Sequence, residues 1–259
     1  MAVKNAHHEA TFDFPIKSII PGQDDQLLLI ETTDVATKTQ TFLLLSFELL
    51  EIIQAISFDE TYHGMVLKSY DKSQLLFIQY SDQNNPDKTN IYTFSWDGGD
   101  PTFAMMNTRI IQSGLDWIKV PHPHFTNKEI YIDLKSGTEI KKEEPREHST
   151  LLPSIIYATA YPDSSEYFTW FVQYFQKHNI VPCRQIEYLK TVNHALISYY
   201  EEKQNGLSNT LVILEADGTI KEQILLEDQL PGIGKDTFFI FRNKAIFVTQ
   251  KSTLNIYDL

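Results

Sequence analysis

The sequence predicts an all-β protein assembled from repeated β-hairpins. Three observations lead to this prediction: apolar runs rich in β-branched and aromatic residues, a hairpin phrase that recurs along the chain, and a regular spacing between its copies. The chain has 259 residues, of which 42% are hydrophobic, so it is long enough to bury a sizeable core. A β-architecture of this length often forms one domain, although two are possible.

The hairpin phrase is clearest at Ile130–Ile140, where IYIDLKSGTEI reads as an alternating strand, a short polar turn and the start of a second strand. Glycines such as Gly137 and Gly218 supply the positive φ that these tight turns need. Similar phrases occur at Thr41–Glu51, Asn90–Asp100, Glu166–Gln176, Thr210–Ile220 and the C-terminal TLNIYDL.

A second apolar run precedes each phrase, and these runs start near residues 26, 74, 114, 154, 194 and 244. Successive starts therefore differ by 48, 40, 40, 40 and 50 residues. A period of about 40–50 residues is typical of β-propeller blades, which cover one another's faces by stacking around an axis. We therefore expect one propeller-like domain over residues 1–259, with about six irregular four-stranded blades. Five or seven blades are alternatives, and a paired β-sandwich is the alternative architecture.

The last repeat unit ends at Leu259 without a fourth strand. We expect the N-terminal segment Thr11–Ile20 to supply that strand and close the ring. Pro15 should then lie on the outer edge, because proline has no N–H to donate within a sheet.

Two segments have helical features. Phe47–Ile56 places apolar residues at helical spacing, and Glu166–Asn179 is apolar on every face, as in a buried helix. The register of the repeat places a strand in both segments, so both are predicted as strands.

The net charge is −12, from 34 acidic and 22 basic residues. Charge of this sign repels phosphate backbones and anionic membranes, so we expect neither nucleic acid nor a membrane as a partner. The sequence contains no apolar run of membrane-spanning length and no pattern of a secretory signal. Its single cysteine, Cys183, cannot form an internal disulfide, and these features together predict a cytoplasmic protein.

In period and hairpin rhythm the whole chain resembles the β-propeller superfamily. The GH…WD signature of the WD40 class is absent, and the double glycine of the kelch class occurs once, at Gly98 and Gly99. The irregular blades, rich in Ile, Lys, Asn and Tyr, are similar to uncharacterised propeller-like proteins of Bacteroidetes-type bacteria. This resemblance implies a fold and a bacterial source, and it carries over no catalytic residue.

The local motif most suggestive of a binding site is WIKVPHPHF, residues 117–125. In an extended segment His122 and His124 would face the same side, as two metal ligands do. A metal site needs a third ligand, and only Asp116 and Glu129 are close in sequence. We therefore expect a proline-stiffened surface loop and no metal site.

Other motifs are incomplete. LPGIGKDT at Leu230–Thr237 has Gln229 where a phosphate loop needs glycine and Asp236 where it needs Ser or Thr. No GxSxG, HExxH or CxxC pattern occurs, so the sequence identifies no catalytic residue and no cofactor.

These features predict a non-catalytic binding or scaffold protein that holds an unidentified protein or small-molecule ligand on one face of a propeller. The alternative is a hydrolase or lyase whose polar groups converge on the central channel from several blades. The candidate ligand-binding residues are Trp117, His122, His124, Asp236 and Arg242.

Overall fold

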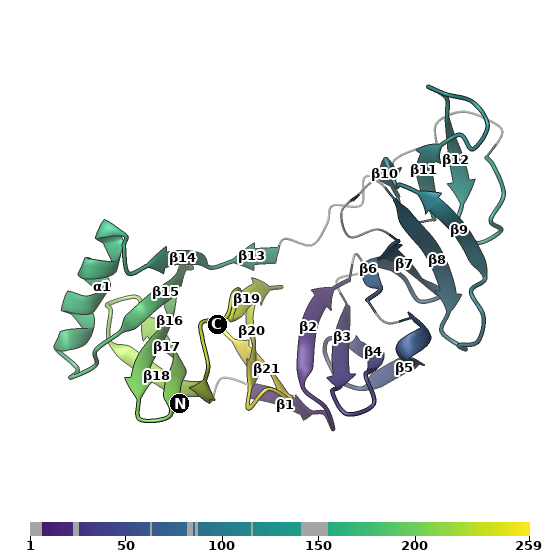
Figure 1. Cartoon of the computed structure of the whole chain (residues 1–259). Helices are drawn as coiled ribbons and strands as arrows, with labels where there is room; N and C mark the ends of the chain where they lie inside the picture. Colours follow the sequence, from purple (N-terminus) through teal and green to yellow (C-terminus); the bar gives the residue numbers. More distant parts are fainter. Residues whose placement is uncertain are drawn as a thin grey trace. The chain divides into compact units, whose positions relative to one another are not determined.

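The computed structural model describes residues 7–22, 26–62, 64–81, 85, 88–114, 116–140 and 155–259. Across these residues the protein is all-β, with five antiparallel sheets and one α-helix (Figure 1). The chain divides into two compact units. The central unit is Lys17–Leu152, and the terminal unit combines Met1–Ile16 with Pro153–Leu259. The single domain over residues 1–259 stays a prediction.

The central unit contains three sheets whose strands are neighbours in both sequence and space. Sheet 1 comprises β2 (Ile16–Pro21), β3 (Leu27–Asp34), β4 (Thr39–Ser46) and β5 (Ile52–Phe58). A 3-10 helix at Glu60–Tyr62 leads into sheet 2, with β6 (Val66–Tyr70), β7 (Gln74–Tyr80), β8 (Thr89–Ser95) and β9 (Phe103–Thr108). Sheet 3 comprises β10 (Gln112–Ser113), β11 (Trp117–Pro121) and β12 (Glu129–Asp133).

Sheet 2 has apolar layers on both of its faces. In β7, Leu75 and Phe77 pack in the core shared with sheet 1. The intervening residues Leu76 and Ile78 pack in the core shared with sheet 3. Successive strand residues point to opposite faces, so a strand covered on both faces reads as a continuous apolar run. This is why the repeated runs lack the alternation of a half-exposed strand.

An aromatic cluster fills the layer between sheets 1 and 2. Phe42 and Phe58 from sheet 1 meet Phe77 and Phe94 from sheet 2, with ring centroids 4.7–5.9 Å apart in edge-on geometry. Edge-to-face pairs place the positive ring edge against the negative face of the neighbouring ring, which adds to the gain from burial.

The terminal unit contains two five-stranded sheets and the helix α1 (Glu166–Gln176). Sheet 4 comprises β14 (Thr159–Pro162), β15 (Cys183–Lys190), β16 (His194–Lys203), β17 (Gly206–Glu215) and β18 (Ile220–Leu230). In sheet 5 the order is β1 (His7–Thr11), β21 (Thr253–Asp258), β20 (Lys244–Thr249), β19 (Phe238–Phe241) and β13 (Ile155–Tyr157).

Sheet 4, like sheet 2, is covered on both faces. Leu211 and Ile213 of β17 pack in a core with sheet 5. Val212 and Leu214 of the same strand pack in a second core with α1. The helix therefore does for sheet 4 what a neighbouring sheet does for sheet 2.

Five of the six predicted repeat units correspond to the five sheets. The runs near residues 26, 74, 114, 194 and 244 form β3, β7, β11, β16 and β20, each an inner strand of its sheet. The unit near residue 154 forms no sheet of its own, because β13 joins sheet 5 and β14 joins sheet 4. The all-β prediction is confirmed, with five sheets of three to five strands in place of uniform four-stranded blades. No closed ring of blades is seen among the described residues.

The N-terminal segment does pair with the last strand, although its predicted bounds were wrong. The pairing strand is β1, with His7 opposite Tyr257 and Thr11 opposite Thr253. Ile16–Pro21 instead forms β2 at the edge of sheet 1, where Lys17 and Ser18 donate hydrogen bonds of 2.6 and 2.7 Å to the carboxylate of Glu31. That buried carboxylate holds β2 in the central unit. Pro15 lies between β1 and β2 and belongs to neither strand.

The strand prediction for Glu166–Asn179 was wrong, because residues 166–176 form α1. The Ser165 side chain accepts a hydrogen bond of 3.3 Å from the Tyr167 N–H, which caps the helix. Phe168 and Phe175, seven residues apart, are buried on one helical face. The strand prediction for Phe47–Ile56 was half correct, because β5 starts at Ile52 after a turn.

The aromatic cluster provides a test of the core. Replacing the fully buried Phe77 by Ala should lower the free energy of unfolding by about 3–5 kcal/mol, because it removes apolar contacts and leaves a cavity. Urea unfolding followed by circular dichroism measures this loss. The control Phe125→Ala removes the same ring from a position that is 62% exposed and should change stability by about 0.5 kcal/mol or less. Similar losses in both variants would contradict this account of the core.

Candidate functional site

Trp117, the first predicted ligand-binding residue, is part of the core of the central unit. It lies on β11 and is 5% exposed. Its ring packs edge-on against Tyr131, with centroids 5.3 Å apart. A Cβ added at Gly114 would lie 2.3 Å from the indole Nε1, so glycine is required for this close approach. Trp117 is therefore placed to pack and not to stack on a ligand.

His122 and His124 lie together in the loop between β11 and β12. Their ring centroids are 6.0 Å apart, and the His124 N–H donates a hydrogen bond of 3.0 Å to His122 Nδ1. The backbone thus occupies one of the two imidazole nitrogens of His122. Within the described ranges, no group of three His, Cys, Asp or Glu residues is arranged to hold a metal ion. The geometry is that of a loop stabilised by its own side chain.

Asp236 and Arg242 lie at opposite ends of β19 in the terminal unit, so the structure does not bring them together. Asp236 has a φ of +53°, and its N–H donates a hydrogen bond of 2.9 Å to Glu187 Oε1. Arg242 and Asn243, with φ of +51° and +59°, form the turn between β19 and β20. Two successive positive φ values are the geometry of a type I′ hairpin turn.

Sequence reasoning missed the buried carboxylate of Glu187, which is 2% exposed. Besides the Asp236 N–H, it accepts hydrogen bonds from the Thr237 N–H at 2.8 Å and from Thr237 Oγ1 at 2.6 Å. These three hydrogen bonds therefore fix the connection between β18 and β19 to sheet 4. In the sequence RQIEYLK, Glu187 looks like an ordinary outward-facing strand residue, so no local signal could have identified this role.

A second missed group ties β16, β17 and β18 together at one end of sheet 4. His194 is 8% exposed, and Lys221 Nζ lies 3.1 Å from its Nε2. Glu215 carboxylate oxygens lie 3.6 Å from His194 Nε2 and 3.6 Å from Lys221 Nζ. When the His194 imidazole is neutral and carries its proton on Nδ1, the Lys221 ammonium donates a hydrogen bond to Nε2. The Nδ1 atom has no hydrogen-bond partner within the described part of the chain.

Burial is the main cause that lowers the pKa of His194, and the positive charge of Lys221 lowers it further. The negative charge of Glu215 acts in the opposite direction. The imidazole is therefore held neutral under conditions in which an exposed histidine begins to take up a proton.

The helix α1 of the terminal unit carries a partly exposed aromatic stripe. It consists of Tyr167, Trp170, Phe171 and Tyr174, whose i, i+3, i+4, i+7 spacing puts them on one side of the helix. Phe171 and Tyr174 are half-buried: the Phe171 ring lies 5.4 Å from that of Tyr188, and the Tyr174 hydroxyl donates 2.9 Å to the Gly218 carbonyl. These contacts hold the inner part of the stripe against sheet 4.

The outer part of the aromatic stripe faces solvent. Trp170 is 66% exposed and Tyr167 is 44% exposed, with their rings 5.2 Å apart in edge-on contact. Tyr161 of β14 extends the stripe, because its ring lies 5.7 Å from Tyr167 and 5.5 Å from Phe171. Exposed clusters of tryptophan and tyrosine are characteristic of protein–protein interfaces.

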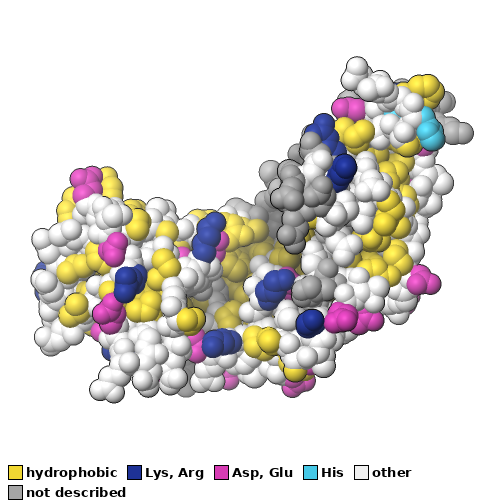
Figure 2. Space-filling view, in the orientation of Figure 1, with side chains coloured by type: hydrophobic (Ala, Val, Ile, Leu, Met, Phe, Trp, Pro, Cys, Tyr) yellow, Lys and Arg dark blue, Asp and Glu magenta, His cyan; other side chains and the backbone are white. Residues whose placement is uncertain are grey.

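Charged residues surround the stripe at both ends of the helix. Asp163 and Glu166 lie at its N-terminal end and Lys177 at its C-terminal end. Acidic side chains occur at several places over the visible face of both units, interspersed with basic and apolar ones (Figure 2). The stripe is thus an apolar surface on an acidic protein.

Comparisons with known proteins give no family. No family model matches the chain, and no curated protein matches it. Among solved structures, the chain resembles the uncharacterized protein lmo1340 from Listeria monocytogenes EGD-e, with a TM-score of 0.32 and 8% sequence identity. The match covers 93% of this chain and 81% of the Listeria protein. A likeness of this degree carries no functional argument. Within the described ranges, no helix has the length and hydropathy that a membrane span needs.

The His194 group predicts a pH dependence. The folded pKa lies below the ordinary value of 6.5, so as the pH falls below 6.5 the unfolded chain takes up a proton that the folded protein does not. The neutral imidazole's contribution to stability is therefore fully present above pH 6.5 and is lost as the pH falls toward the folded pKa. Relative to a His194→Gln variant, the wild type should lose free energy of unfolding as the pH falls below about 6.5.

Urea unfolding at several pH values measures this difference between wild type and variant. His124→Gln is the matched control, because it removes an exposed histidine with no comparable burial. If the difference in free energy of unfolding between wild type and His194→Gln stays constant as the pH falls below about 6.5, the prediction is contradicted.

Proposed function

We propose that this chain is a non-catalytic binding protein that docks a partner protein through the aromatic stripe of α1. The observation that carries the proposal is the 66% exposure of Trp170, in edge-on contact with Tyr167 on an anchored helix. Large aromatic side chains at the centre of an interface supply much of its binding energy.

The stripe is held in place before any partner arrives. Phe168 and Phe175 fix the inner face of α1, while Phe171 and Tyr174 are half-buried against sheet 4. Preorganised side chains lose little conformational entropy on binding. Covering Trp170 and Tyr167 would gain roughly 25 cal/mol for each Å² of apolar surface removed from water.

Charge favours a partner with basic residues around its apolar anchor. A second copy of this chain would bring another net charge of −12, and an anionic membrane would be repelled in the same way. A basic partner would be steered toward the protein, and Asp163 and Glu166 lie next to the stripe to receive it.

We extend the proposal to the arrangement of the five sheets. We propose that the five sheets are blades of a propeller-like arrangement, in line with the five repeat units that form them. The pairing of β1 with β21 is the contact that an N-terminal closing strand would make. A cytoplasmic location in a bacterium, without nucleic-acid or membrane partners, rests on the net charge, the lone cysteine and the resemblance in sequence style. The alternative of a hydrolase or lyase gains no support from the geometry, because the candidate residues within each unit are not gathered around one reacting position.

Partner capture by the full chain tests this proposal. Trp170→Ser and Tyr167→Ser should each reduce capture of a specific partner about tenfold or more, because they remove exposed anchor rings. Quantitative mass spectrometry of bound proteins measures the reduction, and added salt should weaken capture if the partner is basic.

The matched control is Val181→Ser, which removes another exposed apolar side chain from the terminal unit, at a position 70% exposed. All three variants should keep wild-type thermal stability, because these side chains are exposed. Equal capture by wild type and Trp170→Ser would overturn the proposal. Self-association lost in Trp170→Ser and seen by sedimentation would assign the stripe to a second copy of the chain instead.

A further inference from the structure

The strand β5 is the outer edge of sheet 1 in the central unit. It pairs with β4 on one side, and no strand in the described part of the chain pairs with its other side (Figure 1). The N–H and C=O groups that point outward from β5 therefore form a row of backbone donors and acceptors without a strand partner. Such a row is complementary to the backbone of another extended segment.

β5 lacks the protection that natural edge strands commonly have. Charged side chains or proline along an edge discourage pairing with other strands, and the β5 sequence IIQAISF contains neither. Ile56 and Phe58 are buried in the core shared with sheet 2, whereas Ile52 and Ile53 are 54% and 49% exposed. The edge is therefore uncharged and carries exposed apolar surface.

A β-bulge accounts for the exposure of both isoleucines. Ile53 is the extra residue of β5, because neighbouring residues of β4 pair with Ile52 and Gln54 and none pairs with Ile53. Consecutive strand residues normally point to opposite faces, but here both isoleucines are outside the core. Leu49, in the turn before the strand, is 68% exposed. The regular edge over residues 54–58 thus begins beside a group of exposed apolar side chains.

An acidic residue lies just outside each end of β5. Glu51 precedes the strand and Asp59 follows it. Neither carboxylate forms an ion pair within the described ranges. Asp59 Oδ1 accepts a hydrogen bond of 2.9 Å from the Thr61 N–H, which leaves its negative charge in place. A strand with a positive charge at each end would therefore be attracted to this edge.

The same two carboxylates disfavour a second copy of this chain on the edge. In an antiparallel pair of β5 strands centred on Ala55, Glu51 of one copy would face Asp59 of the other at both ends. Like charges directly opposite each other in a sheet are destabilising. The edge suits a different chain with basic residues at the ends of its strand.

We infer that β5 binds an extended segment of a partner protein by strand addition. The centre of the segment is uncharged and β-branched, pairs with residues 54–58 and covers Ile52 and Ile53. Its two ends carry Lys or Arg residues that face Glu51 and Asp59. β5 belongs to the central unit and the aromatic stripe to the terminal unit, so this inference does not rest on the proposed function.

Isothermal titration of the full chain with the peptide acetyl-KTVTVTVK-amide tests the inference. This peptide has a high strand propensity and a lysine at each end, and we expect a dissociation constant of about 100 µM or lower. The peptide acetyl-ETVTVTVE-amide reverses the terminal charges, and acetyl-KGSGSGSK-amide keeps them without β-branched residues. Each should bind at least about tenfold more weakly, because the first lacks charge complementarity and the second lacks strand propensity.

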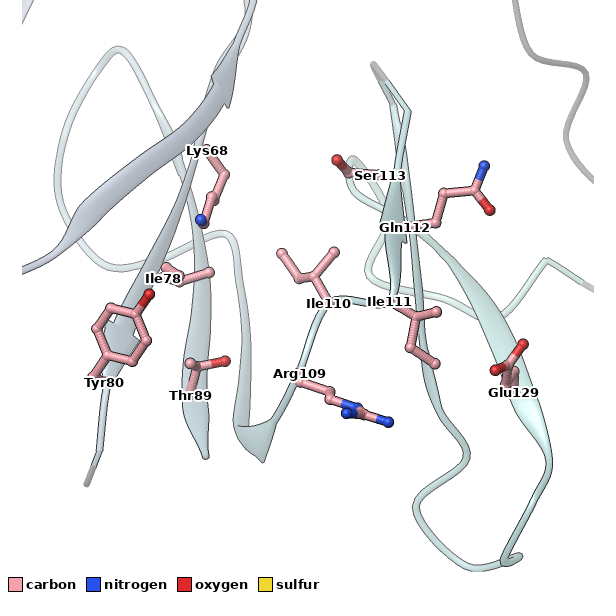
Figure 3. A pocket seen from close by; sticks show the side chains of 10 residues that line it. All are labelled: Lys68, Ile78, Tyr80, Thr89, Arg109, Ile110, Ile111, Gln112, Ser113 and Glu129. Atoms are coloured by element: carbon pink, nitrogen blue, oxygen red, sulfur yellow. The ribbon is translucent and has the colours of Figure 1, made fainter. Parts of the chain in front are cut away.

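A charge placed on the edge shows whether the peptide binds β5. Ile53→Lys should weaken binding of acetyl-KTVTVTVK-amide at least about tenfold, because a lysine on an edge strand opposes pairing and repels the basic peptide. The matched control is Ile111→Lys, which adds the same charge at a 40% exposed isoleucine on the connection between β9 and β10 (Figure 3). The control should keep wild-type affinity, and both variants should keep wild-type thermal unfolding, because both side chains are exposed.

Two further measurements locate the peptide and test the charge at the strand end. Hydrogen exchange of the β5 amides should slow when acetyl-KTVTVTVK-amide binds, because outward N–H groups become hydrogen-bonded. Glu51→Gln should weaken binding about threefold, because it removes one attractive charge next to the edge.

Several results would each overturn the inference. They are an absence of binding at about 1 mM, equal binding of the three peptides, wild-type affinity in Ile53→Lys, and slowed exchange confined to other strands. Self-association that is seen by sedimentation and abolished by Ile53→Lys would also overturn it, because the edge would then bind a second copy of the chain.

Discussion

The structure depends on one constraint: the inner strands of sheets 2 and 4 are apolar on both faces, and both faces must be covered. In β7 and β17 consecutive residues enter opposite cores, so neither strand has a face that tolerates water. Antiparallel sheets joined by short hairpins meet this constraint by stacking. The positions of Phe77, of the aromatic cluster and of α1 all follow from it.

At α1 a helix, and not another sheet, covers a sheet face. Sheet 4 has sheet 5 on one face and α1 on the other. A helix packed on a sheet buries only one of its faces and leaves the sides of the helix exposed. In α1 one exposed side carries Tyr167 and Trp170. A break in the repeat thus produces the aromatic stripe.

Buried charge fixes the connections that hydrophobic packing leaves undetermined. Glu31 anchors β2 to sheet 1, and Glu187 anchors the connection into β19. His194 and its neighbours join three strand ends of sheet 4. A buried carboxylate with several donors is costly to leave unpaired, so each such group strongly favours one local arrangement.

The sequence by itself determined the inner strands, because continuous apolar runs rich in β-branched and aromatic residues, and the glycine turns between them, are local properties. It therefore identified the inner strand of every sheet and the turns at Gly137 and Gly218, whose φ values are +68° and +84°. Only the tertiary structure decided that residues 166–176 are helical, because an evenly apolar segment suits either structure until its cap and buried face are known. Tertiary structure alone also revealed the roles of Glu187 and His194. Their roles depend on side chains from strands far apart in sequence, and no spacing along a single chain records such contacts.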